Sequence, residues 1–160
     1  MQTILKNEVL GPFLDDDDVL KIAQHRMVGP VSLAAFDCNW TTSPEKNYFN
    51  VWAVVSFHQR TDKVFLQGGR FCHWNMEYEM KLVSTKNNVS LYRLSLHNAD
   101  DFPNEFVLRL ERENGEHIYD NNNYSNFSIE HSQGHSMSAI AQGAGIFSFE
   151  SIISAKVMHS

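Results

Sequence analysis

Strict alternation of apolar and polar residues constrains the fold of this chain more than any other feature. It occurs over the stretches 77–82, 91–96 and 105–111, each about as long as one β-strand. Successive side chains of a strand point to opposite faces, so a period of two predicts a strand with one buried and one exposed face. Three such strands predict an antiparallel β-sandwich. The positions predicted to face inward are Tyr78, Met80, Leu82, Tyr92, Leu94, Leu96, Phe106, Leu108 and Leu110.

Turn residues separate the predicted strands. Asn-Gly suits the positive φ angles of a tight hairpin, so we expect the strand 105–112 to pair with 116–119. The stretches 48–57 and 63–67 predict two more strands, and the first is so continuously apolar that we expect it to be central in its sheet. The apolar stretch 146–157 predicts a closing strand. The turn signals are Gly68-Gly69, Lys86-Asn87-Asn88, the stretch 100–103 and Asn114-Gly115.

The chain is expected to form one domain. Its 160 residues, 42% of them hydrophobic, are enough for a real core. We expect an all-β, immunoglobulin-like antiparallel β-sandwich over 48–130, an irregular N-terminal extension over 1–47, and a loop with the closing strand over 131–160. The acidic run 15–18 favours the start of a short helix, or a solvated loop, over a cation site. Calcium loops place ligands at alternating positions with a Gly and a distal Glu, which this run lacks.

Charge and hydropathy argue against several classes of partner. The net charge is −6 and the 13 basic residues are scattered, so no nucleic-acid partner is expected. No apolar run is long enough to cross a bilayer, so no membrane partner is expected. The N-terminus lacks the pattern of a signal peptide, which predicts a cytoplasmic location if Met1 is the native start. Cys38 and Cys72 form one bridge or stay free, and the sequence leaves both alternatives open.

No pattern of catalytic or metal-binding residues is complete. His131 and His135 have the spacing of metal ligands on a helix, but the glycine and serines around them predict a loop. Cys72-His73 are adjacent, and adjacent side chains of a strand point to opposite faces. We therefore expect no catalysis, no cofactor and no metal. An enzyme would require His73, His117 or His131 to meet carboxylates in a cleft.

The stretch 119–127 joins aromatic rings to a dense set of side-chain amides. It reads Tyr119-Asp120-Asn121-Asn122-Asn123-Tyr124-Ser125-Asn126-Phe127. Sugar rings stack on aromatic side chains, and their hydroxyl groups both donate and accept hydrogen bonds, as an Asn side chain does. The simpler interpretation is an Asn-rich turn, because Asn tolerates left-handed backbone. In that case Asp120 and the Asn side chains bond to the backbone and hold the end of the hairpin.

The context of this stretch resembles a known pattern. The strand 105–111, the Asn114-Gly115 turn and the segment 118–127 are similar to the C-terminal half of a family 21 carbohydrate-binding module. The signature is an aromatic residue, Asp-Asn-Asn, three further residues, then Asn and an aromatic residue. The resemblance covers about 48–130 loosely and 105–129 specifically. It implies a starch- and glycogen-binding β-sandwich, as found attached to amylolytic enzymes and in glycogen-targeting subunits of a protein phosphatase.

The resemblance also implies a binding site. Trp74 corresponds to a sugar-stacking residue of the family, and the glycines and Asn75 around it predict a loop beside Tyr119. Val107 stands where the family often has an aromatic residue, and Tyr124 is the candidate to replace that ring. The predicted carbohydrate-binding residues are Trp74, Tyr119, Asn121, Asn123, Tyr124 and Asn126.

The predicted function is non-catalytic binding of an α-glucan oligosaccharide or polysaccharide. The alternative is a protein-interaction β-sandwich, with another protein as partner and a purely structural Asn-rich loop. Glycogen-targeting relatives also carry a short phosphatase-docking segment that begins with a basic residue. The nearest candidate here, Val55-Ser56-Phe57, lacks that residue, so phosphatase binding is not predicted.

Overall fold

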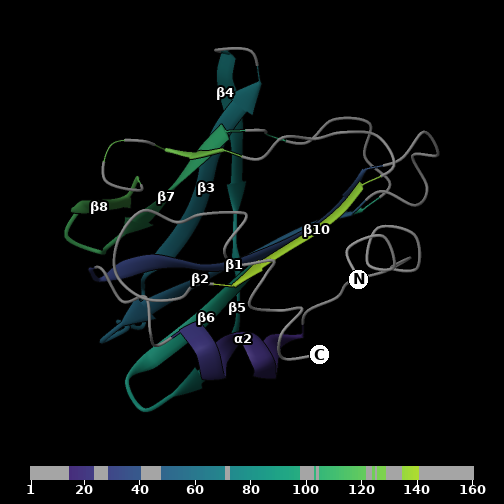
Figure 1. Ribbon diagram of the computed structural model, residues 1–160. Coiled ribbons are helices and arrows are strands. Elements are labelled where there is room, and N and C mark those ends of the chain that lie inside the picture. The colour runs from purple at the N-terminus through teal and green to yellow at the C-terminus, as the bar shows by residue number, and fades with distance from the viewer. Residues whose placement is uncertain are drawn as a thin grey trace.

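Two antiparallel β-sheets pack face to face in the computed structural model (Figure 1), which describes residues 15–23, 29–40, 48–70, 73–97, 103, 105–121, 124, 126–128 and 135–140. Sheet A has the strand order β10 (His135–Ile140), β1 (Val31–Trp40), β2 (Tyr48–Ser56), β6 (Val89–His97) and β5 (Lys81–Lys86). Sheet B has the order β4 (His73–Glu79), β3 (Lys63–Arg70), β7 (Glu105–Glu111) and β8 (His117–Asp120), and β9 (Phe127–Ser128) also pairs with β7. The predicted all-β antiparallel sandwich is confirmed, and its immunoglobulin-like character stays a prediction.

Aromatic residues from both sheets form the centre of the core. Phe49 of β2 meets Phe106 of β7 edge to face, with ring centroids 6.3 Å apart. Phe106 also contacts Phe127 of β9, at a centroid distance of 5.4 Å. All three side chains are buried, and such offset or edge-to-face pairs add to the stabilisation that burial provides. Phe127, the last residue of the Asn-rich stretch, therefore belongs to the core.

Sheet A is buried on both faces at its centre. Side chains of β2 alternate between the two faces, yet all of 48–55 are buried. Helix α2 (Asp16–Ala23) covers the outer face, where Asp16 Oδ1 accepts a hydrogen bond from Trp52 Nε1 at 2.8 Å. Asp16 also forms an ion pair with Arg93 of β6, at 2.8 Å. The continuously apolar run is thus a central strand, as predicted, because both of its faces are covered.

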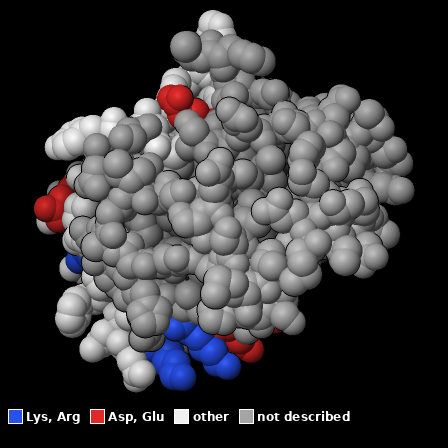
Figure 2. Space-filling model, in the orientation of Figure 1, with Lys and Arg blue, Asp and Glu red and all other residues white. Residues whose placement is uncertain are grey.

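The acidic run 15–18 contains the N-terminus of α2, so the helix alternative is confirmed. The carbonyl of Asp15 accepts the backbone N–H of Val19 at 3.1 Å and closes the first turn. Asp16 and Asp17 lie in that turn, where negative charge interacts favourably with the helix dipole. Val19 is fully buried in the core cluster. Figure 2 shows acidic and basic side chains gathered at the lower edge of the molecule, the end at which Figure 1 places α2.

Both Asn-containing turns form hairpins; the sequence predicted the strand pairing for Asn114-Gly115 and a turn for Lys86-Asn87-Asn88. Gly115 has a φ of 85°, and Asn114 Oδ1 accepts the backbone N–H of Glu116 at 2.9 Å. Strand β7 therefore pairs with β8 over the expected residues. In the other hairpin, Asn87 and Asn88 have φ angles of 52° and 66° between β5 and β6. Two successive positive φ angles match the twist of the flanking strands.

The sandwich extends beyond the predicted stretch 48–130 on both sides. Strand β1 lies within the predicted irregular extension, and β10 lies within the predicted loop. The two strands pair with each other at one side of sheet A. Residues 31–36 are all buried, so β1 lacks the alternation that marks a half-exposed strand. The predicted closing strand 146–157 lies outside the described residues.

The predicted strand 77–82 is divided between the two sheets. Its first half ends β4 in sheet B, and its second half begins β5 in sheet A. Met80 lies at the corner, is buried, and donates its N–H to the carbonyl of Val64 at 2.8 Å. Leu82 is 42% exposed, so its predicted inward orientation is wrong. The sequence alternates between polar and apolar residues through the corner. Its periodicity therefore does not reveal that the chain passes from one sheet to the other.

Gly68-Gly69 marks a close approach of strands, and the predicted turn there is wrong. Both glycines belong to β3, whose register with β4 shifts between Gly68 and Arg70. A Cβ on Gly69 would clash with the carbonyl of His73, and one on Gly68 with the carbonyl of Glu105. Glycine is required here because neighbouring backbone occupies the space of a side chain.

Candidate functional site

Asp120 connects the two sheets. Its Oδ2 accepts a hydrogen bond from the backbone N–H of Leu33 at 2.7 Å, and the Asp120 side chain is buried. Leu33 borders a bulge of β1, where the register with β2 shifts. A bulge leaves backbone groups without ladder partners, and an ionised carboxylate is a strong acceptor for one of them. Asp120 is therefore a structural residue of the Asn-rich stretch.

Asn121 organises the turn that follows β8. Its Oδ1 accepts the backbone N–H of Tyr124 at 3.1 Å, and its carbonyl accepts the N–H of Asn126 at 2.9 Å. Tyr124 and Asn126 have φ angles of 69° and 60°, in the left-handed region that side chains disfavour. The Tyr124 ring is 92% exposed. The turn thus holds a tyrosine in a strained backbone conformation and presents its ring to solvent.

Tyr119 and Asn126 lie on either side of this turn. Tyr119 pairs in register with Arg109 and points away from the core, because its neighbour Asp120 points inward. Its ring is 49% exposed. Asn126 is half-buried and donates from Nδ2 to Glu105 Oε1 at 3.3 Å. Asn123, the remaining predicted residue of the loop, lies outside the described residues.

Trp74 lies far from Tyr119, and its predicted place in a loop is wrong. It belongs to β4 and is 39% exposed. Strands β4 and β8 are at opposite ends of the order β4-β3-β7-β8, with two strands between them (Figure 1). Neighbouring strands are spaced by about 4.8 Å, so the two residues are separated by roughly 14 Å across the sheet alone. Trp74 and Tyr119 therefore do not form one stacking platform.

Arg109 lies on the outer face of sheet B, where it pairs in register with Tyr119. Its Nη2 lies 2.6 Å from Glu77 Oε1, and its Nη1 donates to Gln67 at 3.3 Å. The guanidinium also lies over the ring of Phe65, 4.5 Å from its centroid. Its side chain is only 12% exposed, so the network holds Arg109 flat against the sheet. Both Nη atoms of Arg109 are thus engaged by neighbouring side chains on the outer face of sheet B.

The histidines and cysteines give little further chemistry in the described part of the chain. His117 Nε2 lies 3.9 Å from Glu111 Oε2, and both side chains are more than a third exposed. Among the described residues, no group of three or more His, Cys, Asp or Glu side chains is placed to hold a metal ion. Cys72 and His131 lie outside the described residues, so pairing of the cysteines stays open. None of the described helices is long and apolar enough to cross a membrane.

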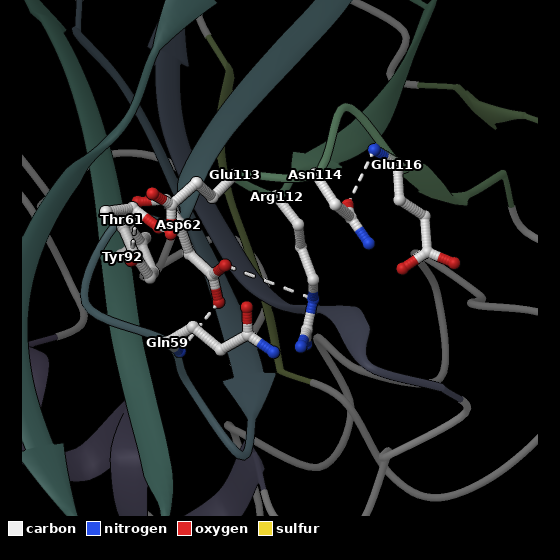
Figure 3. A network of polar contacts seen from close by, with 8 residues as sticks. All are labelled: Gln59, Thr61, Asp62, Tyr92, Arg112, Glu113, Asn114 and Glu116. Carbon is white, nitrogen blue, oxygen red and sulfur yellow. Dashed lines mark hydrogen bonds and ion pairs between the residues drawn. The ribbon is translucent and has the colours of Figure 1, made fainter.

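A second polar cluster joins the turn between β2 and β3 to the hairpin between β7 and β8 (Figure 3). Asp62 Oδ2 accepts the backbone N–H of Gln59 at 2.9 Å, and Asp62 Oδ1 lies 4.0 Å from Arg112 Nε. Thr61 donates to Glu113 Oε2 at 3.4 Å. These residues come from two distant turns and share no motif, so linear spacing gave no signal for them.

Tyr92 closes this cluster from sheet A. Its ring is buried, and its hydroxyl donates to the carbonyl of Asp62 at 3.5 Å. Burial, and secondly the negative charge of Asp62, raise the pKa of Tyr92 to about 12. The hydroxyl is therefore protonated, and remains a donor, throughout the physiological range.

Comparison with known proteins found no family model that matches the chain and no match among curated proteins. The resemblance to family 21 carbohydrate-binding modules therefore stays a prediction carried by residues 105–129.

Proposed function

We propose that this protein is a non-catalytic carbohydrate-binding module that binds an α-glucan at the β8 end of sheet B. The observation that carries the proposal is the conformation of Tyr124, whose exposed ring stands on a left-handed backbone fixed by Asn121. Such strain persists only where neighbouring interactions impose it, and it occurs preferentially at ligand sites. An exposed aromatic ring with restricted backbone loses little entropy when a sugar stacks on it.

The remaining contacts in this proposal come from the same turn. Tyr119 provides a second exposed ring and pairs in register with Arg109, two residues before β7 ends at Glu111. Asn121 Oδ1 accepts a hydrogen bond from the Tyr124 backbone. In the part of the chain that the structure describes, Asn121 Nδ2 donates no hydrogen bond, so it can donate one to a sugar hydroxyl. Two stacked rings contribute about 0.5–1.5 kcal/mol each beyond burial. We therefore expect a dissociation constant of roughly micromolar to millimolar.

Trp74 has no place in this site and favours the second candidate function, protein interaction. It lies on β4, which ends sheet B in the strand order of the described elements. An edge strand offers backbone donors and acceptors for pairing with another chain. An exposed tryptophan on such a strand is a typical anchor at protein interfaces.

The test is calorimetric titration with maltoheptaose and β-cyclodextrin. Tyr124→Ala and Tyr119→Ala are expected to weaken binding about tenfold each, whereas Trp74→Ala leaves it unchanged. Phe57→Ala is a matched control, because Phe57 is also an exposed aromatic residue with positive φ, in the turn after β2. Circular dichroism verifies that each variant is folded.

The outcomes separate the candidates. Loss of binding in the tyrosine variants alone supports the proposed site. Loss of sugar binding in Trp74→Ala alone would assign the binding site to the edge strand β4. No heat with millimolar sugar for the wild-type protein would contradict the carbohydrate proposal and leave protein interaction as the better candidate.

A further inference from the structure

A pocket of about 470 Å³ lies where the chain passes from sheet B to sheet A. It is lined by the turn before β3, by the corner between β4 and β5, and by Tyr92 of β6. Its volume falls within the range of small-molecule sites. None of its lining residues belongs to the proposed carbohydrate site, so an inference about this pocket does not depend on that site.

Three cationic side chains surround this pocket. They are Arg60, Lys63 and Lys81, and all three are exposed. In the part of the chain that the structure describes, none of them lies within 4.0 Å of a carboxylate oxygen as an ion pair. Three cationic residues without an ion pair in the described part of the chain line one concavity, and they favour a positive local potential there within a chain of net charge −6.

The acidic residues of the pocket offset only part of this potential. Asp62 also lines it, but its Oδ2 is hydrogen-bonded to Gln59 and its Oδ1 is directed to Arg112, two residues outside the lining (Figure 3). Of the described lining residues, only Glu79 offers a carboxylate that is not engaged in this way. Three cationic residues of the lining therefore stand against two carboxylates, Asp62 and Glu79, of which Asp62 is also 4.0 Å from Arg112.

The rest of the lining is apolar or aromatic. Met80 is buried at the corner, and Leu82 is 42% exposed at the start of β5. The buried ring of Tyr92 lies 5.8 Å from the ring of His58, which also lines the pocket. A ligand that covers the exposed leucine removes apolar surface from water, and this lowers the free energy of binding. The pocket thus combines a cationic side with an apolar side.

We propose that this pocket binds a small organic anion, with a carboxylate or phosphate group among Arg60, Lys63 and Lys81 and an apolar body against Met80, Leu82 and Tyr92. The charge fixes the orientation of the ligand, and the apolar wall supplies the area that it buries. Glu79 disfavours ligands that would place their negative charge beside it.

The experiment is a calorimetric titration at low ionic strength with phenyl phosphate, benzoate, benzyl alcohol and benzylamine. We expect the two anions to bind, phenyl phosphate more tightly than inorganic phosphate, and the alcohol and amine not to bind. The Lys63→Gln, Lys81→Gln double variant is expected to bind phenyl phosphate roughly five- to tenfold more weakly. Leu82→Ser is expected to weaken phenyl phosphate and leave inorganic phosphate unchanged.

The matched control is the Lys21→Gln, Lys86→Gln double variant. It removes the same charge from exposed positions outside the pocket, on α2 and at the end of β5, so it measures the effect of net charge alone. Equal weakening of phenyl phosphate binding in the two double variants would overturn the proposal. The anion would then respond to the net charge of the protein and not to the charges of the pocket. Binding of benzylamine in place of the anions would overturn it as well, as would the absence of any binding by the folded wild-type protein.

Discussion

The two sheets of this sandwich differ in what covers their outer faces. Sheet A has α2 on its outer face, and Trp52 lies there with an exposure of 2%. Sheet B has an outer face of charged and aromatic side chains, in which Phe65 is only half-buried beneath Arg109. Both faces follow the same alternation rule. A covered face therefore gives a continuously apolar strand, and an open face gives a clean period of two.

This difference in cover also bears on where each sheet exposes aromatic side chains to a ligand. Sheet A uses both of its faces for packing, whereas sheet B uses one face for the core and exposes the other together with its end strands. The exposed rings of Trp74 and Tyr119 both belong to end strands of sheet B, at opposite sides. Under the proposed function, the carbohydrate contacts lie on sheet B, whereas substitutions on the covered outer face of sheet A are expected to change stability.

The largest expected effect compares the two outer faces directly. Trp52→Ala is expected to destabilise the protein by about 3–5 kcal/mol, because it opens a cavity beneath α2. Phe65→Ala removes a ring of sheet B at an equivalent outward position and is expected to cost about 1 kcal/mol, mainly the contact with Arg109. Urea unfolding followed by circular dichroism measures both. Equal losses would mean that the outer face of sheet B is as much part of the core as that of sheet A.

A smaller effect is expected at the connection between the sheets. Asp120→Ala removes the buried carboxylate that accepts the Leu33 N–H, at a cost of about 3 kcal/mol. Asp120→Asn keeps an oxygen acceptor of the same size and is expected to recover part of this loss. Urea unfolding followed by circular dichroism measures the free energy of unfolding of both variants. A loss below about 0.5 kcal/mol for Asp120→Ala would show that the bulge of β1 does not depend on β8.

Local chemistry explains what the sequence predicted correctly. Asn114-Gly115 and Asn87-Asn88 determine their hairpins through φ angles that few other residues adopt. The continuous apolar run of β2 indicates a strand with both faces covered. The bond from Asn121 to the Tyr124 backbone is likewise a short-range interaction of the kind expected for Asn in turns.

The features that sequence reasoning missed depend on distant parts of the chain. The corner at Met80 keeps the alternation intact, so only the strand pairing reveals it. The separation of Trp74 from Tyr119 follows from strand order, which periodicity does not contain. The pocket beside Lys63 and Lys81 brings together a turn, a corner and a strand that are distant in sequence.

A third prediction concerns Tyr92, which lies where the chain crosses between the sheets. Burial, and secondly the charge of Asp62, raise its pKa in the folded protein from the ordinary tyrosine value of 10.0 to about 12. Between these values the unfolded state loses a proton that the folded state keeps, so stability falls as pH rises from about 10 towards 12, by about 2 kcal/mol in total. Urea unfolding at pH 8, 10 and 11 measures the loss. Tyr92→Phe is expected to remove this part of the pH dependence, and an unchanged slope in that variant would assign it to other groups.

The smallest expected effect tests how α2 is held on sheet A. Asp16 accepts from Trp52 and pairs with Arg93, but the ion pair is about one third exposed, so Asp16→Ala is expected to cost only about 1–2 kcal/mol. Asp17→Ala is the matched control, since it removes the same charge from the same helix turn at an exposed position. Both variants lose the same favourable interaction with the helix dipole, and only Asp16→Ala loses the contacts with sheet A. Equal destabilisation of the two variants would mean that the helix is held by Val19 and its apolar neighbours alone, and the cover of sheet A would then be purely hydrophobic.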